Sequence, residues 1–179
     1  MNFSLKAFPG EEGLPELRIG GTIGRQAGIL SIGYAIEGDL SRLALPAPAL
    51  KPERKDRLWE ETCLELFLAA PGSEIYREFN LSPSGHWNAY RFASYREGMR
   101  EEKAISSLPF LVRLEPGVLR LSLALDLGWI VPAAMDVEAG ICAVIRTTAG
   151  KTSHWALSHT GPRPDFHRRD GFALTIPPQ

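Results

Sequence analysis

Aromatic side chains and hydroxyl-binding side chains are concentrated in residues 58–92. This stretch holds two of the four Trp and two of the four Tyr residues, with several carboxylates among aliphatic residues. Aromatic rings can stack on the apolar faces of a sugar ring, while carboxylate, amide and guanidinium groups bind its hydroxyls. The sequence therefore predicts a non-catalytic site for a small sugar, a glycoconjugate or a related polar ligand. The residues assigned to this site are Trp59, Glu65, Tyr76, Glu78, Asn80, Trp87, Arg91 and Trp155.

Other kinds of chemistry fit parts of the same sequence. Glu65 and Glu78 fall on neighbouring predicted strands, and two carboxylates about 5–10 Å apart form the catalytic pair of glycosidases. His or Met can ligate a haem iron, and Met99 and Met135 are available. Neutral His residues together with carboxylates can bind zinc, although the spacing here is not a recurring one. The residues concerned are His86, His154, His159, His167, Asp165 and Asp170. A structural domain without a ligand is the remaining alternative.

Charge and composition argue against two classes of partner. The 179 residues include 20 basic and 21 acidic side chains, so the basic excess that attracts nucleic acid is missing. No apolar run approaches the roughly 20 residues of a membrane-spanning helix. The N-terminal segment MNFSLKAFPGEEG lacks the apolar core of a secretory signal, and Cys63 and Cys142 are expected to be buried thiols. We therefore expect a cytoplasmic protein that folds as a single domain over residues 1–179.

Short apolar runs separated by Gly and Pro predict an all-β fold. No segment shows the periodicity of a long helix, so two antiparallel sheets must cover each other as a β-sandwich of the jelly-roll type. Residues 38–57 are expected to form a loop with one helical turn, and residues 94–107 a loop with a short helical piece. The expected strands lie at 3–7, 17–23, 28–36, 62–69, 75–81, 86–92, 110–114, 118–125, 140–148, 152–158 and 172–176.

The side-chain alternation of the strands predicts which residues face outward. In 62–69, three Leu residues point to the core, which puts Glu65 on the outer face or makes it a buried carboxylate in need of a partner. The next two strands join through the turn 82–85, Ser-Pro-Ser-Gly. If Ser82 opposes Gly85, the outer face carries Tyr76, Glu78, Asn80, Trp87 and Arg91. A bulge at the turn would shift one strand and exchange its faces.

The order of residues also resembles a known family. The residues that carry the resemblance form the patterns W-x-x-T-C-x-E-x-F-L (59–68), Y-x-x-F-N-x-S-P-S-G-x-W (76–87) and Y-R-F (90–92), with a closing segment at 154–172. These patterns are similar to those of DOMON-like proteins, which are related to family 9 carbohydrate-binding modules. The resemblance covers the chain from about residue 55 onward.

That resemblance implies a two-sheet β-sandwich. In family 9 modules it further implies a sugar held between two Trp side chains, and structural calcium. The candidate positions for the Trp pair are Trp59, Trp87 and Trp155. The sequence has no Asp-rich loop of the kind that binds calcium strongly. Some DOMON relatives bind haem, which is the origin of the haem alternative.

Overall fold

The computed structural model describes residues 1–11 and 15–178. Its strands are β1 (Asn2–Ser4), β2 (Lys6–Ala7), β3 (Leu17–Gln26), β4 (Ile29–Gly38), β5 (Cys63–Ala69), β6 (Tyr76–Leu81), β7 (Trp87–Phe92), β8 (Arg100–Glu101), β9 (Phe110–Glu115), β10 (Val118–Asp126), β11 (Val137–Arg146), β12 (Thr152–Ala156) and β13 (Leu174–Ile176). The helical elements are the 3₁₀ turns η1 (Leu40–Arg42), η2 (Leu58–Glu60) and η3 (Arg169–Gly171). Among the described residues, no helix has the length and apolar character needed to span a membrane.

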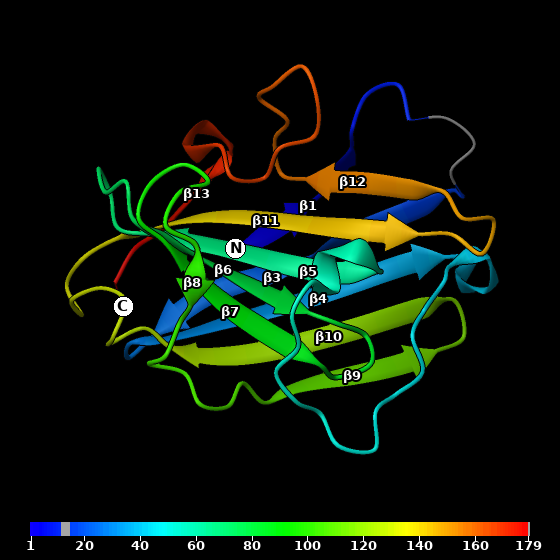
Figure 1. The fold of residues 1–179 in the computed structure, drawn as a ribbon, viewed down its shortest axis with the longest axis horizontal. Helices are drawn as coiled ribbons and strands as arrows, with labels where there is room; N and C mark the ends of the chain where they lie inside the picture. Colours follow the sequence, from blue (N-terminus) through cyan, green and yellow to red (C-terminus); the bar gives the residue numbers. More distant parts are fainter. Residues whose placement is uncertain (12–14, 179) are drawn as a thin grey trace.

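Two antiparallel sheets form the two layers of a β-sandwich (Figure 1). The five-stranded sheet has the order β1-β3-β4-β10-β9. The eight-stranded sheet has the order β2-β12-β11-β5-β6-β7-β8, and β13 pairs with the first residues of β11. The expected all-β, two-sheet antiparallel architecture is therefore confirmed. The helical piece expected within 94–107 is wrong, because this segment contains the short strand β8 instead.

Side-chain alternation explains why the five-stranded sheet has only one buried face. In β10, Leu119, Leu121, Leu123 and Leu125 are buried and the residues between them are mostly exposed. The same alternation runs along β4. These Leu and Ile side chains pack against the inner face of the eight-stranded sheet and form the main core.

The eight-stranded sheet is buried on both faces. Every residue of β5 is buried, because Leu64, Leu66 and Leu68 enter the main core while Phe67 and Ala69 join a second apolar cluster on the opposite face. We call that second face, which is turned away from the five-stranded sheet, the outer face. The second cluster contains Phe67, Ala69, Tyr76, Tyr90, Phe92, Cys142, Ala156 and Phe172. Loops and η2 cover this cluster, so the outer face offers a sheltered floor for a site.

Both cysteine side chains belong to the outer face of the sheet. Cys63 and Cys142 are free and buried, as expected from the sequence. Burial, followed by the charge of Glu65, raises the pKa of each thiol well above its ordinary value. Both therefore remain neutral thiols at physiological pH.

The hairpin between β6 and β7 corrects the predicted strand register. The backbone N–H of Ser82 donates to the carbonyl of His86, which leaves a three-residue loop that ends in Gly85 at φ +94°. This is the bulged hairpin in which a type I turn is followed by a left-handed glycine. The pairing is therefore Asn80 with Asn88 and Leu81 with Trp87, one residue away from the prediction.

This shift exchanges the two faces of β7. Trp87 points into the main core and is only 5% exposed, with the guanidinium of Arg54 4.3 Å from its ring centroid. Arg91 lies on the same side of the sheet as Trp87. Tyr90 and Phe92 occupy the outer face instead. The predicted outward orientation of Trp87 and Arg91 is therefore wrong.

Candidate functional site

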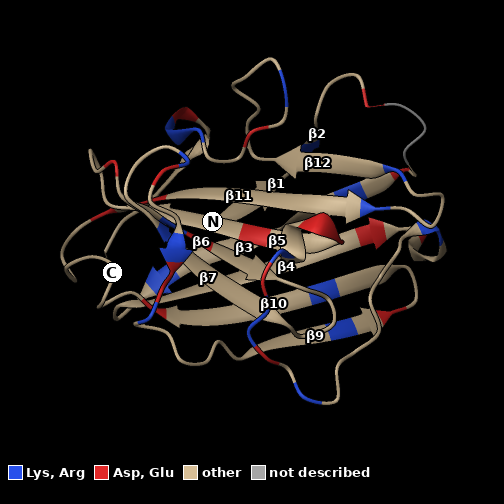
Figure 2. Ribbon diagram, viewed as in Figure 1, with Lys and Arg blue, Asp and Glu red and all other residues tan. Residues whose placement is uncertain are grey.

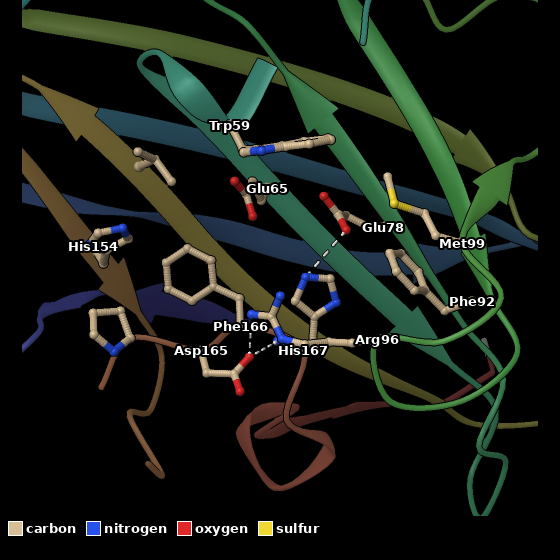
Figure 3. Close-up of a pocket in the computed structure, with 12 residues that line it drawn as sticks. Trp59, Glu65, Glu78, Phe92, Arg96, Met99, His154, Asp165, Phe166 and His167 are labelled. Atoms are coloured by element: carbon tan, nitrogen blue, oxygen red, sulfur yellow. Dashed lines mark hydrogen bonds and ion pairs between the residues drawn. The ribbon is translucent and has the colours of Figure 1, made fainter. Parts of the chain in front are cut away.

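A cavity of about 330 Å³ opens on the outer face of the eight-stranded sheet. We call it the outer-face cavity, and Figure 3 shows its lining from the side of the loops. Its size lies at the lower end of the range for small-molecule sites. It is lined by Trp59, Glu65, Glu78, Phe92, Arg96, Met99, Val144, His154, Pro164, Asp165, Phe166 and His167.

Two carboxylates form the floor of the cavity. Glu65 of β5 pairs with Asn80 of β6, and Glu78 pairs with Phe67, so the two Glu residues are diagonal neighbours on one face. Figure 3 shows both carboxylates pointing into the space between Trp59 on one side and the segment of Phe166 and His167 on the other. In Figure 2, acidic colour appears on β5, in the middle of the sheet. Two neighbouring strands thus present two acidic groups to one small space.

Hydrogen bonds satisfy Glu78 more fully than Glu65. The side-chain amide of Asn80 donates to Oε1 of Glu78 at 2.6 Å, and Nε2 of His167 lies 3.9 Å from Oε2 of Glu78. Glu65 is 3% exposed and its Oε1 has no hydrogen-bond partner. A buried polar atom without a partner is rare in native proteins and calls for an explanation.

Burial controls the protonation of this floor. Burial raises the pKa of Glu78 to about 7, against an ordinary 4.5, and the bond from Asn80 and the charge of Arg96 offset part of this rise. Burial and then the charge of Glu78 raise the pKa of Glu65 well above its ordinary value. At neutral pH the pair therefore holds at least part of a proton that exposed carboxylates would have lost.

His167 is a neutral side chain at neutral pH. Burial and then the charge of Arg96 lower its pKa to about 4. Its Nδ1 lies 2.8 Å from the hydroxyl of Tyr76, which also accepts the backbone N–H of Arg96 at 3.1 Å. Tyr76 thus holds the imidazole in place from beneath the cavity, and the imidazole adds no positive charge next to Glu78.

The outer wall is built from two loops that hold each other. Arg96, in the loop after β7, donates to Oδ1 of Asp165 at 2.8 Å, and the hydroxyl of Tyr95 also bonds to Asp165. Asp165 in turn accepts the backbone N–H of His167. These contacts place Phe166 and His167 over the sheet.

Trp59 forms the opposite wall. It lies on η2, which begins after Arg57 in the left-handed conformation at φ +60° and rests on β5 and β6. Its ring meets Tyr90 edge to face, with centroids 5.7 Å apart. Trp59 is half-buried and its ring lies over the floor (Figure 3).

The structure brings together only part of the predicted site. Trp59, Glu65 and Glu78 line the cavity, while Tyr76 and Asn80 support it from below through His167 and Glu78. Three predicted residues lie elsewhere. Trp87 and Arg91 are on the inner side of the sheet for the reason given above, and Trp155 is 8% exposed in the main core.

Trp155 is turned inward by its own strand. In β12 it pairs with Ala143 of β11, and its indole N–H donates to the hydroxyl of Ser153 at 2.9 Å. Of the three predicted Trp positions, only Trp59 reaches the cavity. The aromatic side chain across the cavity from it is Phe166.

The residues that the sequence assigned to metal binding do not converge. His154 contacts Glu11 at 2.8 Å, and His159 contacts the backbone carbonyl of Lys6. Asp170 is bonded to Arg168 and Asp165 to Arg96. Within residues 1–11 and 15–178, no three His, Cys, Asp or Glu side chains are grouped as metal ligands. Met99 lines the cavity, whereas the carbonyl of Met135 accepts from Arg25 at another place in the fold.

Sequence reasoning missed the part of the site that comes from loops. Arg96, Phe166 and Pro164 carry no periodic signal, because loop residues are positioned by tertiary contacts rather than by strand alternation. The length and the Pro, His and Phe content of 158–172 were the available signals that this loop covers something.

Solved structures with a similar fold are known, although comparisons of sequence find no relative. No family model matches the sequence, and no curated protein matches it significantly. The chain is similar to a candidate carbohydrate-binding protein from Bacteroides uniformis ATCC 8492, with 12% identity and a TM-score of 0.71 over 99% of this chain and 85% of the other.

Two structures of family 9 carbohydrate-binding modules from Caldicellulosiruptor kristjanssonii are also similar to the chain. The module in complex with glucose has 9% identity and a TM-score of 0.53, over 93% of this chain and 78% of that one. The module in complex with cellotriose has 10% identity and a TM-score of 0.51, over 84% and 70%. At these identities the likeness shows a shared two-sheet β-sandwich fold, and the resemblance to DOMON-like proteins remains a prediction.

Proposed function

We propose that the protein binds one small sugar, or the terminal sugar of a glycoconjugate, in the outer-face cavity. The observation that carries the proposal is the pairing of an aromatic wall with a buried polar floor in one open space. Trp59 and Phe166 offer apolar rings, and Glu65 offers a buried oxygen without a partner. A pyranose has apolar C–H faces and a rim of hydroxyls, so it fits both kinds of surface.

Size and fold support the same proposal. A cavity of about 330 Å³ is suited to a small ligand rather than to a long polymer chain. The similar family 9 modules are described in complex with glucose and with cellotriose. In this chain, one Trp and one Phe from different segments take the place of the Trp pair that the sequence resemblance implied.

Titration with a panel of mono- and disaccharides, followed by calorimetry and Trp fluorescence, tests the proposal. We expect saturable binding of at least one monosaccharide, weakened about fivefold in Trp59→Ala, because one aromatic stacking contact is worth about 1 kcal/mol. Trp129→Phe is the matched control. Trp129 contacts Arg77 and Phe79 on the other side of the sheet, so its replacement should leave affinity unchanged. Absence of binding across the panel would refute the proposal.

Glycoside hydrolysis is a second candidate function, favoured by the two carboxylates on the cavity floor. A Glu with a pKa of about 7 suits a general acid. Hydrolysis also needs an ionised partner, and burial raises the pKa of Glu65 too, so binding remains the first proposal. Turnover of a chromogenic glycoside that is abolished by Glu78→Gln without unfolding would establish the enzyme instead.

A further inference from the structure

We infer that the group which the ligand places between Glu65 and Glu78 is a protonated amine, so the site selects an amino sugar over a neutral one. This inference rests on the proposed function, because it names the class of sugar that the outer-face cavity takes. It stands on the geometry of the floor, where two buried carboxylates converge and one buried oxygen has no partner.

The floor of the cavity carries two acidic side chains. Glu65 and Glu78 are 3% and 4% exposed. Among the described residues, the only basic side chain that lines the cavity besides imidazoles is Arg96, which is bonded to Asp165, and half of its side chain is exposed to solvent. Arg96 is ion-paired with Asp165, so its charge offsets only part of the negative charge of the two Glu residues.

The floor has hydrogen-bond acceptors that lack donors. Ionised carboxylates only accept, and an ammonium group donates three hydrogen bonds and accepts none. Oε1 of Glu65 has no donor, and Oε2 of Glu78 is 3.9 Å from the nearest His167 nitrogen, beyond hydrogen-bond distance. An ammonium group supplies donors to both atoms and offsets the buried charge. A neutral hydroxyl supplies one donor and no charge.

The wall above the floor is aromatic. Cations are attracted to the faces of aromatic rings, most strongly to Trp. The Trp59 ring lies over the two carboxylates (Figure 3), so a cation held by them is next to an aromatic surface. Ca²⁺ or Mg²⁺ is less suited, because each takes six or more oxygen ligands. Within the described residues, no three acidic, His or Cys side chains are grouped for any metal ion.

Proton exchange should accompany this binding. The titratable and charged groups around the two Glu residues are Tyr34, Tyr76, Tyr90 with its acceptor Asp56, Cys63, Cys142, Glu61, His154 with Glu11, Arg96, Asp165 and His167. Burial keeps both thiols and the three phenols neutral, and His167 is neutral above about pH 4. Glu78, with a pKa of about 7, is therefore the buried group of this set that titrates near neutral pH, and burial also raises the pKa of Glu65. An arriving ammonium should displace the proton that the two Glu residues hold.

The experiment compares glucosamine with glucose by isothermal titration calorimetry of the full chain at pH 7.0 and pH 5.5. We expect glucosamine to bind at least tenfold more tightly than glucose at pH 7.0. Its affinity should fall about tenfold at pH 5.5, because a carboxyl with a pKa of about 7 is mostly protonated there. Repeating the pH 7.0 titration in buffers of different ionisation enthalpy should show release of protons with glucosamine and not with glucose.

Glu65→Gln and Glu78→Gln test the assignment to the floor. Each keeps the shape of the side chain and removes its charge, so the ratio of the glucose and glucosamine dissociation constants should move toward one. Thermal unfolding of each variant confirms that it is folded. Equal or tighter binding of glucose at pH 7.0 would overturn the inference and leave the proposed function standing. A lack of binding by both sugars would overturn the inference, and the panel of mono- and disaccharides then decides the proposed function.

Discussion

Replacing Glu78 by Gln should make the protein more stable at alkaline pH, and the size of the effect follows from the burial of this carboxyl. The unfolded chain gives Glu78 its ordinary pKa of 4.5, and burial in the folded protein raises it to about 7. Each pKa unit corresponds to about 1.4 kcal/mol. The folded state therefore loses about 3 kcal/mol from this one group between pH 4.5 and pH 8.

The sign follows from which state holds the proton more tightly. The folded protein has the higher pKa, so the stabilisation from Glu78 is fully present below pH 4.5 and is lost as pH rises through about 7. Gln stays neutral at every pH, and its side-chain carbonyl can still accept from Asn80. The variant also removes the Glu78 charge, which raises the pKa of Glu65 in the folded protein. This second effect also favours the variant at alkaline pH.

Urea unfolding between pH 4.5 and pH 8.5, followed by circular dichroism, measures the difference between wild type and Glu78→Gln. We expect almost no difference at pH 4.5 and about 3 kcal/mol in favour of the variant at pH 8, or about 6–12 °C in melting temperature. Glu74→Gln, at an exposed position just before β6, is the matched control and should follow the wild type. A variant that is less stable than wild type at pH 8 would refute the reasoning that Glu78 is a buried, uncompensated carboxylate.

Three further predictions concern the same structure. The imidazole of His167 should stay neutral down to about pH 4 in an NMR titration, and stability from this group should be lost as pH falls from 6.5 toward 4; protonation near pH 6.5 would contradict its burial. Trp87→Ala should lower the free energy of unfolding by about 3–5 kcal/mol, and Trp59→Ala by only about 1 kcal/mol; similar losses would place both rings in the core. Gly21→Ala should cost about 3 kcal/mol or more, because its Cβ would lie 1.8 Å from a backbone carbonyl of β4, while Gly24→Ala, which meets open space, should cost less than 1 kcal/mol.

Strand alternation was enough to predict the two sheets and most strand positions. The Leu row of β10 and the Leu row of β5 each face the main core, as their two-residue period required. The same period placed Glu65 and Glu78 on the outer face. The hairpin turns at 115–118 and 146–152 contain Gly117 and Gly150 at positive φ, as expected for glycine in tight turns between antiparallel strands.

The exchange of faces in β7 shows where such reasoning stops. Ser-Pro-Ser-Gly is compatible with a turn of two or of three residues, and only the longer form pairs Ser82 with His86. That single residue moved Trp87 from the predicted site into the core. The sequence also contains no local signal that pairs Arg96 with Asp165, which are 69 residues apart and meet only in the folded chain.

The central claim is that a sugar binds in the outer-face cavity, and an NMR titration tests it most directly. Each sugar of the mono- and disaccharide panel, with glucose and glucosamine among them, is added separately to the ¹⁵N-labelled protein at pH 7.0. The account predicts that at least one sugar causes saturable shift changes at the Trp59 indole N–H and at the backbone amides of 92–99 and 165–167, which surround the cavity. Changes confined to the five-stranded sheet, or no changes with any sugar of the panel, would contradict it.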